Sequence, residues 1–295
     1  MRVSDKLRYN LSQTRISKFR RQQLDLSAQL SSGVRLNRPS EDPLASKKML
    51  ALRSENRRVE QYTRSLDAAD HLLHTADQTL GEATNGLFRI KEIGIRSING
   101  ANTANDLRFL GDELASIRDF VRNLANTRTN NRYIFGGFIS QTPPYDNANN
   151  FVGDTNTTRY EVGDGELVDA TIVGGSAFGD GTLGTIDIFD NITQLETHVR
   201  AGDVPNIETE LQRLENGIEQ MIQVRQRIGM QMNRVDGARS VNEYLKIRLP
   251  ESISELRDVD FPKAVSDLSL VENTLQATLA ASSRLMKGRS LLDYM

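Results

Sequence analysis

Apolar residues recur every seven positions through the first half of the chain, and a second set follows at an offset of three. This alternation is typical of a helix that buries a narrow seam against other helices. No proline lies between Pro43 and Pro143 to break the pattern. We therefore predict a helix over residues 45–98, roughly 80 Å long if unbroken. The two sets are Leu52, Val59, Leu66, Leu73, Leu80 and Leu87, and Glu55, Tyr62, Ala69, Ala76, Ala83 and Ile90.

The cluster Asn99 to Asn105 has the composition of a turn, and the same alternation resumes after it. Because the connection is short, the second helix should run antiparallel to the first. The resumed set is Leu107, Leu110, Leu114, Ile117, Val121 and Leu124.

The C-terminal half contains two more stretches of this kind, separated by the segment 258–262. Pro250 should interrupt or kink the first stretch, because proline has no N–H to donate to the helix. The second stretch carries a thin apolar stripe, so its helix needs another chain segment or a neighbouring subunit as a partner. The first stretch contains Leu211, Leu214, Ile218, Met221, Ile228, Val235 and Leu249, and the second contains Ala264, Leu268, Val271, Leu275, Thr278, Ser282 and Leu285.

Between the two halves the periodicity changes. Runs of β-branched and aromatic residues at 159–162, 167–173 and 185–189 are bounded by Gly and Asp, which predicts short strands and turns. Ile188, Ile192, Leu195 and Val199 then return to helical spacing. The fold class we predict is mainly α: a long antiparallel helical bundle or coiled coil with a small β insertion at 140–188.

Composition and charge narrow the functional classes. The 295-residue chain has no Cys and no Trp, which excludes a disulfide scaffold, a thiolate metal site and a Cys nucleophile. Its net charge is −2, but positions 1–40 carry a local net charge of +7 and positions 136–186 one of −6. The basic N-terminus is compatible with a transit peptide or a nucleic-acid arm, although a solvated helix face is favoured. The N-terminus lacks the apolar region of a cleaved secretion signal, and no apolar stretch reaches membrane-spanning length.

Three motifs could carry chemistry, and each has a simpler explanation. His71 and His74 lie near three aspartates, which could form a metal site. Both histidines fall outside the helix seam, however, and an ordinary polar helix face explains them more simply. The string Gly179 to Gly184 matches G-x-G-x-x-G, with Asp203 about 20 residues on, yet alternating βα units do not surround it. The segment 146–150 lacks the acidic ladder of a calcium loop. We therefore assign no catalytic, cofactor-binding or metal site and expect no enzyme.

Three stretches carry a more specific signal. They are the segment 29–43, which ends in Pro39-Ser-Glu-Asp-Pro43, the segment Asn131-Arg-Tyr-Ile-Phe-Gly-Gly137, and the C-terminal segments 261–268 and 290–295. In this order they resemble the flagellin superfamily, and the proline-rich form of the first is similar to that of its hook-associated members. Glu41 and Leu292 stand where those proteins more often have Asp and Phe.

The resemblance implies a structural subunit of the bacterial flagellum at the hook–filament junction, exported through the type III apparatus without a cleaved signal. It implies an inner coiled-coil domain of paired terminal helices (1–43 and 258–295), a helical bundle (44–139 and 189–257) and the outer β insertion. The implied partners are hook-associated protein 1, flagellin, further copies of the chain in a ring, and a flagellar export chaperone, with no nucleic acid, membrane or cofactor.

The thin apolar stripes at the two ends of the chain are the candidate assembly residues. Subunit contacts would supply the apolar burial that such helices lack alone. The set is Leu7, Leu11, Leu24, Leu30, Leu268, Val271, Leu275, Leu279, Leu285 and Leu292. The candidate turn between the inner and middle domains contains Gly33, Pro39, Asp42 and Pro43, since Gly and Pro favour a break between helices. The alternatives are a filament flagellin and, from another class, a dinucleotide-binding enzyme.

Overall fold

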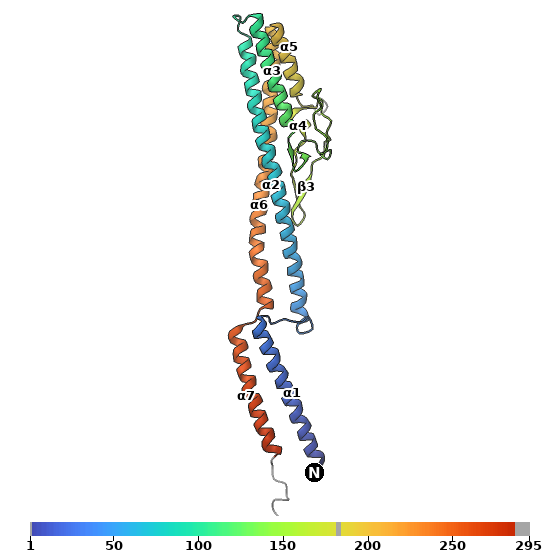
Figure 1. Cartoon of the computed structure of the whole chain (residues 1–295), viewed down its shortest axis with the longest axis vertical. Coiled ribbons are helices and arrows are strands. Elements are labelled where there is room, and N and C mark those ends of the chain that lie inside the picture. Colours follow the sequence, from blue (N-terminus) through green and yellow to red (C-terminus); the bar gives the residue numbers. More distant parts are fainter. Residues whose placement is uncertain (1, 181–183, 287–295) are drawn as a thin grey trace, which may run out of the picture. The chain divides into compact units, whose positions relative to one another are not determined.

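The computed structural model describes residues 2–180 and 184–286. The chain divides into two compact units, one formed by Met1–Arg57 and Lys246–Met295 and the other by Arg58–Leu245. Helices dominate both units (Figure 1). The mainly α fold class is confirmed, and the two long helices α2 (Pro43–Ser97) and α6 (Val204–Arg257) contribute residues to each unit.

The first unit is built around the antiparallel pair α1 (Arg2–Ser32) and α7 (Phe261–Met286). The Ser12 hydroxyl lies 2.9 Å from that of Ser282, and Gln23 donates to Glu272 at 3.1 Å. Ser12 and Ser282 both belong to the partly buried seam, whereas Glu272 is exposed beside it. The two helices therefore meet along a seam that is only partly apolar.

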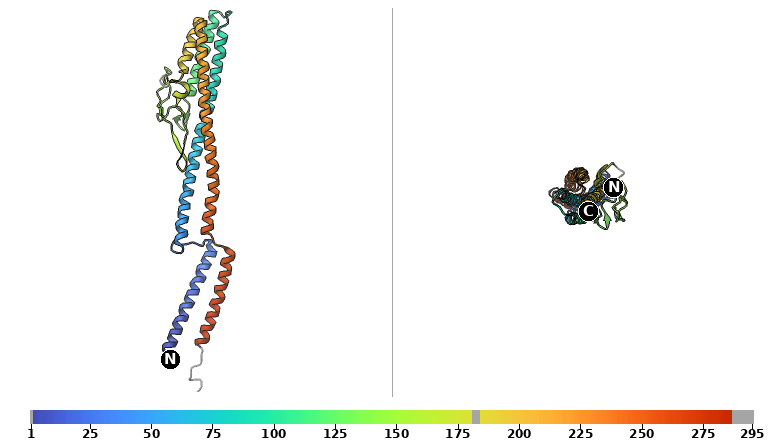
Figure 2. Two further views of the ribbon diagram at one scale, coloured as in Figure 1. Left: turned by 180° about the vertical axis from the view of Figure 1, so that it is seen from behind. Right: turned by 90° about the horizontal axis from the view of Figure 1, so that it is seen from above.

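The second unit is a bundle of α2, α3 (Ala104–Ala125), α5 (Ile188–Ala201) and α6, which run side by side in both long views (Figures 1 and 2). The predicted α2 seam is confirmed from Val59 to Ile90, all of whose members are buried. Leu52 and Glu55, at its start, are only half-buried. Antiparallel packing of α2 on α6 is marked by the ion pairs Asp77–Arg225 at 2.8 Å and Lys91–Glu215 at 2.7 Å.

The predicted turn after α2 is confirmed, and its chemistry explains where α3 begins. Thr103 and Asp106 form a capping box, in which each side chain accepts from the other residue's backbone N–H. Hydrogen bonds from Thr103 to the Asp106 carboxylate lower the pKa of that carboxyl group below its usual value. Helix α3 then packs on α5, where Arg118 contacts Glu196 at 2.6 Å.

Two predictions about helix limits need correction. Pro250 does not interrupt the C-terminal stretch, since α6 continues to Arg257, and a kink at this position stays a prediction. Pro250 is exposed, and its missing N–H removes a single backbone hydrogen bond from a helix that stays packed at Leu249. The segment 185–189 is no strand: Asp187 accepts hydrogen bonds from the backbone N–H groups of Phe189 and Asp190 and so starts α5 at Ile188.

The β region consists of two separate antiparallel hairpins on the flank of the bundle (Figure 2). The predicted strand at 159–162 is confirmed as β3 (Arg159–Gly163), which pairs with β4 (Glu166–Asp169). The predicted run to Val173 ends earlier, and the short helix α4 (Gly174–Phe178) follows. Strands β1 (Arg128–Thr129) and β2 (Arg132–Tyr133) were not predicted; Asn130 and Asn131, both with positive φ, form the tight turn between them.

A cluster of aromatic rings ties this region to α5. Tyr145 lies at its centre, with ring centroids 4.9 Å from Phe189 and 5.8 Å from Phe178. The Tyr145 hydroxyl donates to the Gly179 carbonyl at 2.9 Å, and burial, with Asp187 and Asp180 nearby, raises the pKa of that hydroxyl well above its usual value. The Asn126 side chain donates a hydrogen bond to the Tyr145 carbonyl and accepts one from the Tyr145 N–H. The β region is thus fixed by packing and by buried hydrogen bonds.

Candidate assembly surface

Helices α1 and α7 use only one side of α1 for their contact. Most of the half-buried residues of α1 follow the 4,3 spacing of a seam, namely Ser12, Ile16, Phe19, Gln23, Leu26 and Leu30. On α7 the corresponding buried or half-buried positions are Ala264, Leu268, Val271, Leu275, Thr278 and Ser282. Four predicted assembly residues, Leu30, Leu268, Val271 and Leu275, therefore face a partner within the chain.

The other predicted residues of α1 lie opposite the seam. Leu7, Leu11 and Leu24 are 70%, 52% and 69% exposed, and heptad spacing places them on the face of α1 directed away from α7. The apolar stripe predicted from the sequence of α1 thus contains residues of two different helix faces. On α7, Leu279 is exposed, whereas the side chain of Leu285 and the whole of Leu292 lie outside the described residues.

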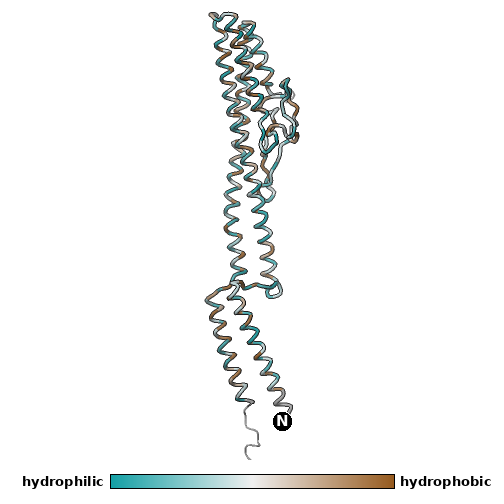
Figure 3. The backbone as a smooth tube through the Cα atoms, viewed as in Figure 1, coloured by the Kyte–Doolittle hydropathy of each residue, from teal (hydrophilic) through white to brown (hydrophobic). Residues whose placement is uncertain are grey.

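Sequence reasoning missed three exposed apolar residues of α7: Phe261, Val265 and Leu270. They fall outside the 4,3 repeat of the predicted stripe. These residues are apolar positions beyond those needed for the seam. They can be recognised as extra only when the seam with α1 is known. Figure 3 shows that apolar residues are frequent along α7 and sparse along the largely hydrophilic α1.

The outer side of α1 is also strongly basic. Arg15, Lys18, Arg20 and Arg21 are all exposed. Within residues 2–180 and 184–286, none of these four side chains forms an ion pair. The exposed leucines therefore lie among cationic side chains that no acidic group of the described chain neutralises.

The segment after α1 is held in place by backbone pairing. Gly33 ends α1 with φ of +71°, and its carbonyl accepts a hydrogen bond from the Val259 N–H at 3.0 Å. The Arg35 N–H donates to the Arg257 carbonyl at 2.7 Å. Hydrogen bonds from Arg257 and Ser254 lower the pKa of the Asp258 carboxyl group. The exits of α1 and α6 are thereby joined.

The remaining turn residues start α2. The Asp42 carboxylate accepts from the Ala45 N–H at 2.9 Å, and Pro43 is the first helical residue, where its missing N–H costs nothing. Pro39 is exposed within the turn. Glu41 accepts hydrogen bonds from the N–H groups of Asn37 and Arg38 at 3.0 and 3.3 Å. A glutamate at this position thus has a local structural role.

In the part of the chain that is described, the other candidate motifs show no binding geometry. His74 contacts Asp70 on the same helix at 3.4 Å, and the described residues contain no group of three potential metal ligands. The glycine string follows the short helix α4 instead of a strand, and Gly181 lies outside the described residues. Asp146 accepts from the Asn150 N–H at 2.8 Å, which closes a turn. Among the helices that are described, none combines the length and hydropathy needed to cross a membrane.

Two family models match the chain, and together they cover well over half of it. The bacterial flagellin N-terminal helical region matches residues 3–139, and the bacterial flagellin C-terminal helical region matches residues 211–295. The chain therefore belongs to the bacterial flagellin family, whose members are structural proteins of the flagellum.

Within that family, the chain is similar to flagellar hook-associated protein 3 over its full length. The protein of that name from Escherichia coli K12 is 24% identical, with 99% of each chain covered. Flagellin of Bacillus subtilis 168 is also 24% identical, but the alignment covers only 86% of this chain and 87% of that flagellin. The flagellin similarity is thus less extensive than that to hook-associated protein 3.

Solved structures share the fold. FlgL of Bacillus cereus superposes with a TM-score of 0.60 at 20% identity, and covers 69% of this chain and 99% of its own. The flagellar junction protein FlgL of Legionella pneumophila superposes with a TM-score of 0.59 at 16% identity, and covers 72% of this chain and 100% of its own.

Proposed function

We propose that this chain is the structural subunit of the hook–filament junction, joining the hook side of the flagellum to the flagellin filament by helix packing. The observation that carries the proposal is its full-length similarity to hook-associated protein 3. The unpaired outer face of α1 supports it physically. A helix with a polar seam and exposed leucines gains apolar burial only when another subunit covers it.

The assembly surface of this proposal is the outer face of the terminal helices. It comprises Leu7, Leu11 and Leu24 of α1 with Leu279 of α7. The sequence also predicts Leu285 and Leu292 as assembly residues, and their side chains lie outside the described part of the chain. The seam residues Leu30, Leu268, Val271 and Leu275 act indirectly, because they hold α1 and α7 in the pair that presents this face. Cationic residues beside the leucines favour neighbours with acidic surfaces.

The turn of Gly33, Pro39, Asp42 and Pro43 is the proposed connection between an inner assembly domain (1–43 and 258–295) and a helical bundle (44–139 and 189–257) that carries the β insertion (140–188). Gly33 ends one helix and Asp42 with Pro43 starts the next, which supports a defined turn instead of a loose linker. Altering these residues should leave a stable subunit that fails to seat on the hook.

The proposed partners are hook-associated protein 1 on the hook side, flagellin on the filament side and further copies of the chain in a ring. Before assembly, a flagellar export chaperone would bind the C-terminal segment, and the type III apparatus would export the chain without a cleaved signal. The proposed location is therefore extracellular, at the junction. No catalytic step is part of this role.

Labelling of intact flagella tests the location. Gold-conjugated antibodies against this chain should mark the tip of the hook at the base of the filament. Labelling along the whole filament would instead identify the chain as a filament flagellin. Antibodies against the flagellin of the same cells, which should mark the whole filament, are the internal control.

The variant L7Q/L11Q/L24Q separates assembly from folding. Because the three side chains are exposed in the subunit, its unfolding free energy should change by no more than about 0.5 kcal/mol for each substitution. Cells that carry the variant should lose attached filaments, because the apolar contact between subunits is gone. Thermal unfolding of the purified chain and a count of filaments per cell are the two measurements.

The matched control is L44Q/L167Q, which changes two leucines that are exposed outside α1 and α7. It should retain normal filament numbers. Normal filament numbers in the triple variant would contradict the assignment of the outer α1 face to assembly.

A further inference from the structure

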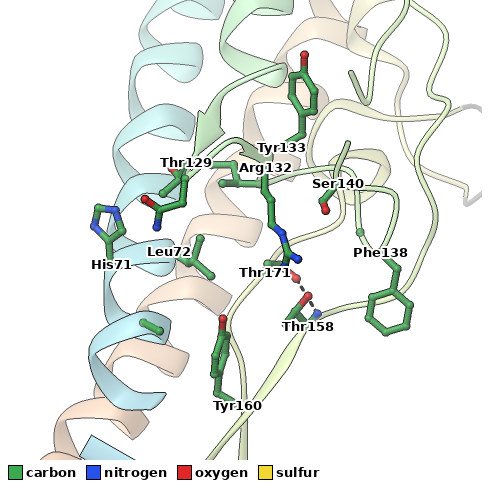
Figure 4. Close-up of a pocket in the computed structure, with 14 residues that line it drawn as sticks. His71, Leu72, Thr129, Arg132, Tyr133, Phe138, Ser140, Thr158, Tyr160 and Thr171 are labelled. Atoms are coloured by element: carbon green, nitrogen blue, oxygen red, sulfur yellow. Dashed lines mark hydrogen bonds between the residues drawn. The ribbon is translucent and has the colours of Figure 1, made fainter. Parts of the chain in front are cut away.

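A hollow of about 520 Å³ lies between α2 and the two hairpins of the second unit (Figure 4). Helix α2 supplies His71 and Leu72, the β1–β2 hairpin supplies Thr129 and Arg132, and Tyr160 comes from β3. This volume falls within the range of about 300–1,000 Å³ that is usual for small-molecule sites. The hollow is distinct from the terminal helices to which we assign assembly.

The lining of the hollow contains one cation, Arg132, and lies beside an acidic part of the chain. Positions 136–186 have a net charge of −6, yet no Asp or Glu is among the described residues that line the hollow. Arg132 is exposed, and its side chain forms no hydrogen bond or ion pair that involves residues 2–180 or 184–286, whereas the neighbouring Arg128 lies over the Tyr133 ring. Arg132 therefore presents a free guanidinium to a ligand.

The alternation of side chains along β3 explains this separation of charge. Thr158 and Tyr160 line the hollow, whereas Arg159 pairs with Asp169 at 2.9 Å and Glu161 accepts from the Tyr62 hydroxyl at 3.4 Å. Successive residues of a strand point to opposite faces. The Glu161 and Asp169 carboxylates are thus directed away from the hollow.

Hydroxyl groups with unused hydrogen-bonding capacity converge on the same space. In Figure 4 the side chains of Arg132, Thr158, Tyr160 and Thr171 approach one another across the hollow. The Thr171 oxygen accepts from the Thr158 N–H at 2.8 Å, which leaves its hydroxyl proton available. The hydroxyls of Thr129, Ser140 and Tyr160 have no partner in the part of the chain that is described.

An aromatic ring stands at the mouth of the hollow. Phe138 is 63% exposed, and its backbone N–H donates to the Asp154 carboxylate at 2.9 Å. That hydrogen bond fixes the loop and lowers the pKa of the Asp154 carboxyl group. The backbone that carries Phe138 is thereby fixed, and its exposed ring offers an apolar surface beside the free guanidinium and the hydroxyls.

We propose that this hollow binds a sugar that bears a carboxylate, such as a uronic acid. Arg132 matches the carboxylate through a charge-assisted, bidentate hydrogen bond. The Ser, Thr and Tyr hydroxyls both donate and accept, as the hydroxyls of a sugar require. The Phe138 ring packs against the apolar C–H face of the sugar. A peptide carboxylate would use Arg132 but leave most of these hydroxyls without partners.

Titration of the full-length chain with D-glucuronic acid, followed by ligand-observed NMR, tests the proposal. Binding should weaken about tenfold or more in R132Q, because the charge-assisted bond is lost. F138A should weaken it severalfold, and both substitutions replace exposed side chains that the fold does not need. R159Q, which removes a cation from the opposite face of β3, should bind normally.

Three further probes separate the parts of the ligand. D-Glucose has the hydroxyls without the carboxylate, and N-acetyl-glutamate and inorganic phosphate have the negative charge without the sugar; each should bind at least about tenfold more weakly than glucuronate. Equal binding of N-acetyl-glutamate or phosphate would overturn the proposal in favour of a plain anion site. Absence of glucuronate binding, or binding unaffected by R132Q, would overturn it as well.

Discussion

Replacing Leu73 with alanine should lower the free energy of unfolding by about 2–5 kcal/mol, because a fully buried leucine is truncated and leaves a cavity. Leu73 is completely buried in the α2 seam, and its seam neighbours Ala69 and Ala76 are small and also buried. Alanine neighbours allow close helix packing, and their methyl side chains are too short to move into the space. Urea unfolding followed by circular dichroism measures the loss.

Leu50→Ala is the matched control, since it is the same substitution on the same helix at a position that is 62% exposed. It should change the stability by no more than about 0.5 kcal/mol. A loss well below 1 kcal/mol for Leu73→Ala would show that the seam from Val59 to Ile90 does not carry the packing of the bundle.

Replacing Gly179 with alanine should destabilise the β region by about 3 kcal/mol or more. Gly179 has φ of +89°, and an added Cβ would lie 2.2 Å from the Ile186 carbonyl oxygen and 2.5 Å from the Asp187 Cα. Both are backbone atoms, so no side-chain rotation relieves the clash. The shift would disturb the Gly179 carbonyl that accepts from Tyr145 and the Asp187 cap of α5.

Gly165→Ala separates the clash from the backbone conformation. Gly165 also has positive φ, +74°, but an added Cβ would have no atom within 4 Å. It should cost about 1–2 kcal/mol, the penalty of the left-handed conformation alone. The two variants are compared by urea unfolding and by the near-ultraviolet circular dichroism of the aromatic side chains. Equal losses would contradict the proposed backbone clash at Gly179.

The long helices were predictable because their signals are local and repeated. The heptads of α2 set which side is buried, and Asp42 with Pro43 marks where the helix starts. The error at 185–189 has the same origin: its β-branched residues are typical of a strand, but Asp187 caps a helix whose seam begins at Ile188. Local chemistry was present in both cases, and the capping residue had the larger effect.

The β region was less predictable because its contacts join residues far apart in the chain. Tyr145 packs on Phe178 and Phe189 and is held by Asn126, and no periodicity connects these positions. The hollow lined by Arg132 has the same character. The Arg132 guanidinium is free because side chains alternate between the two faces of β3. Arg159 pairs with Asp169 on the other face, so this carboxylate is directed away from Arg132.

The sequence by itself determined the helices of this protein, most of the turns between them and, through three short motifs, its family. Only the tertiary structure decided which terminal leucines pack within the chain and which remain exposed. Leu30 lies in the seam with α7, whereas Leu7, Leu11 and Leu24 lie on the opposite face of α1. The physical reason is that α1 has few apolar residues on any side, so its buried face is set by the helix that packs against it and not by its own periodicity.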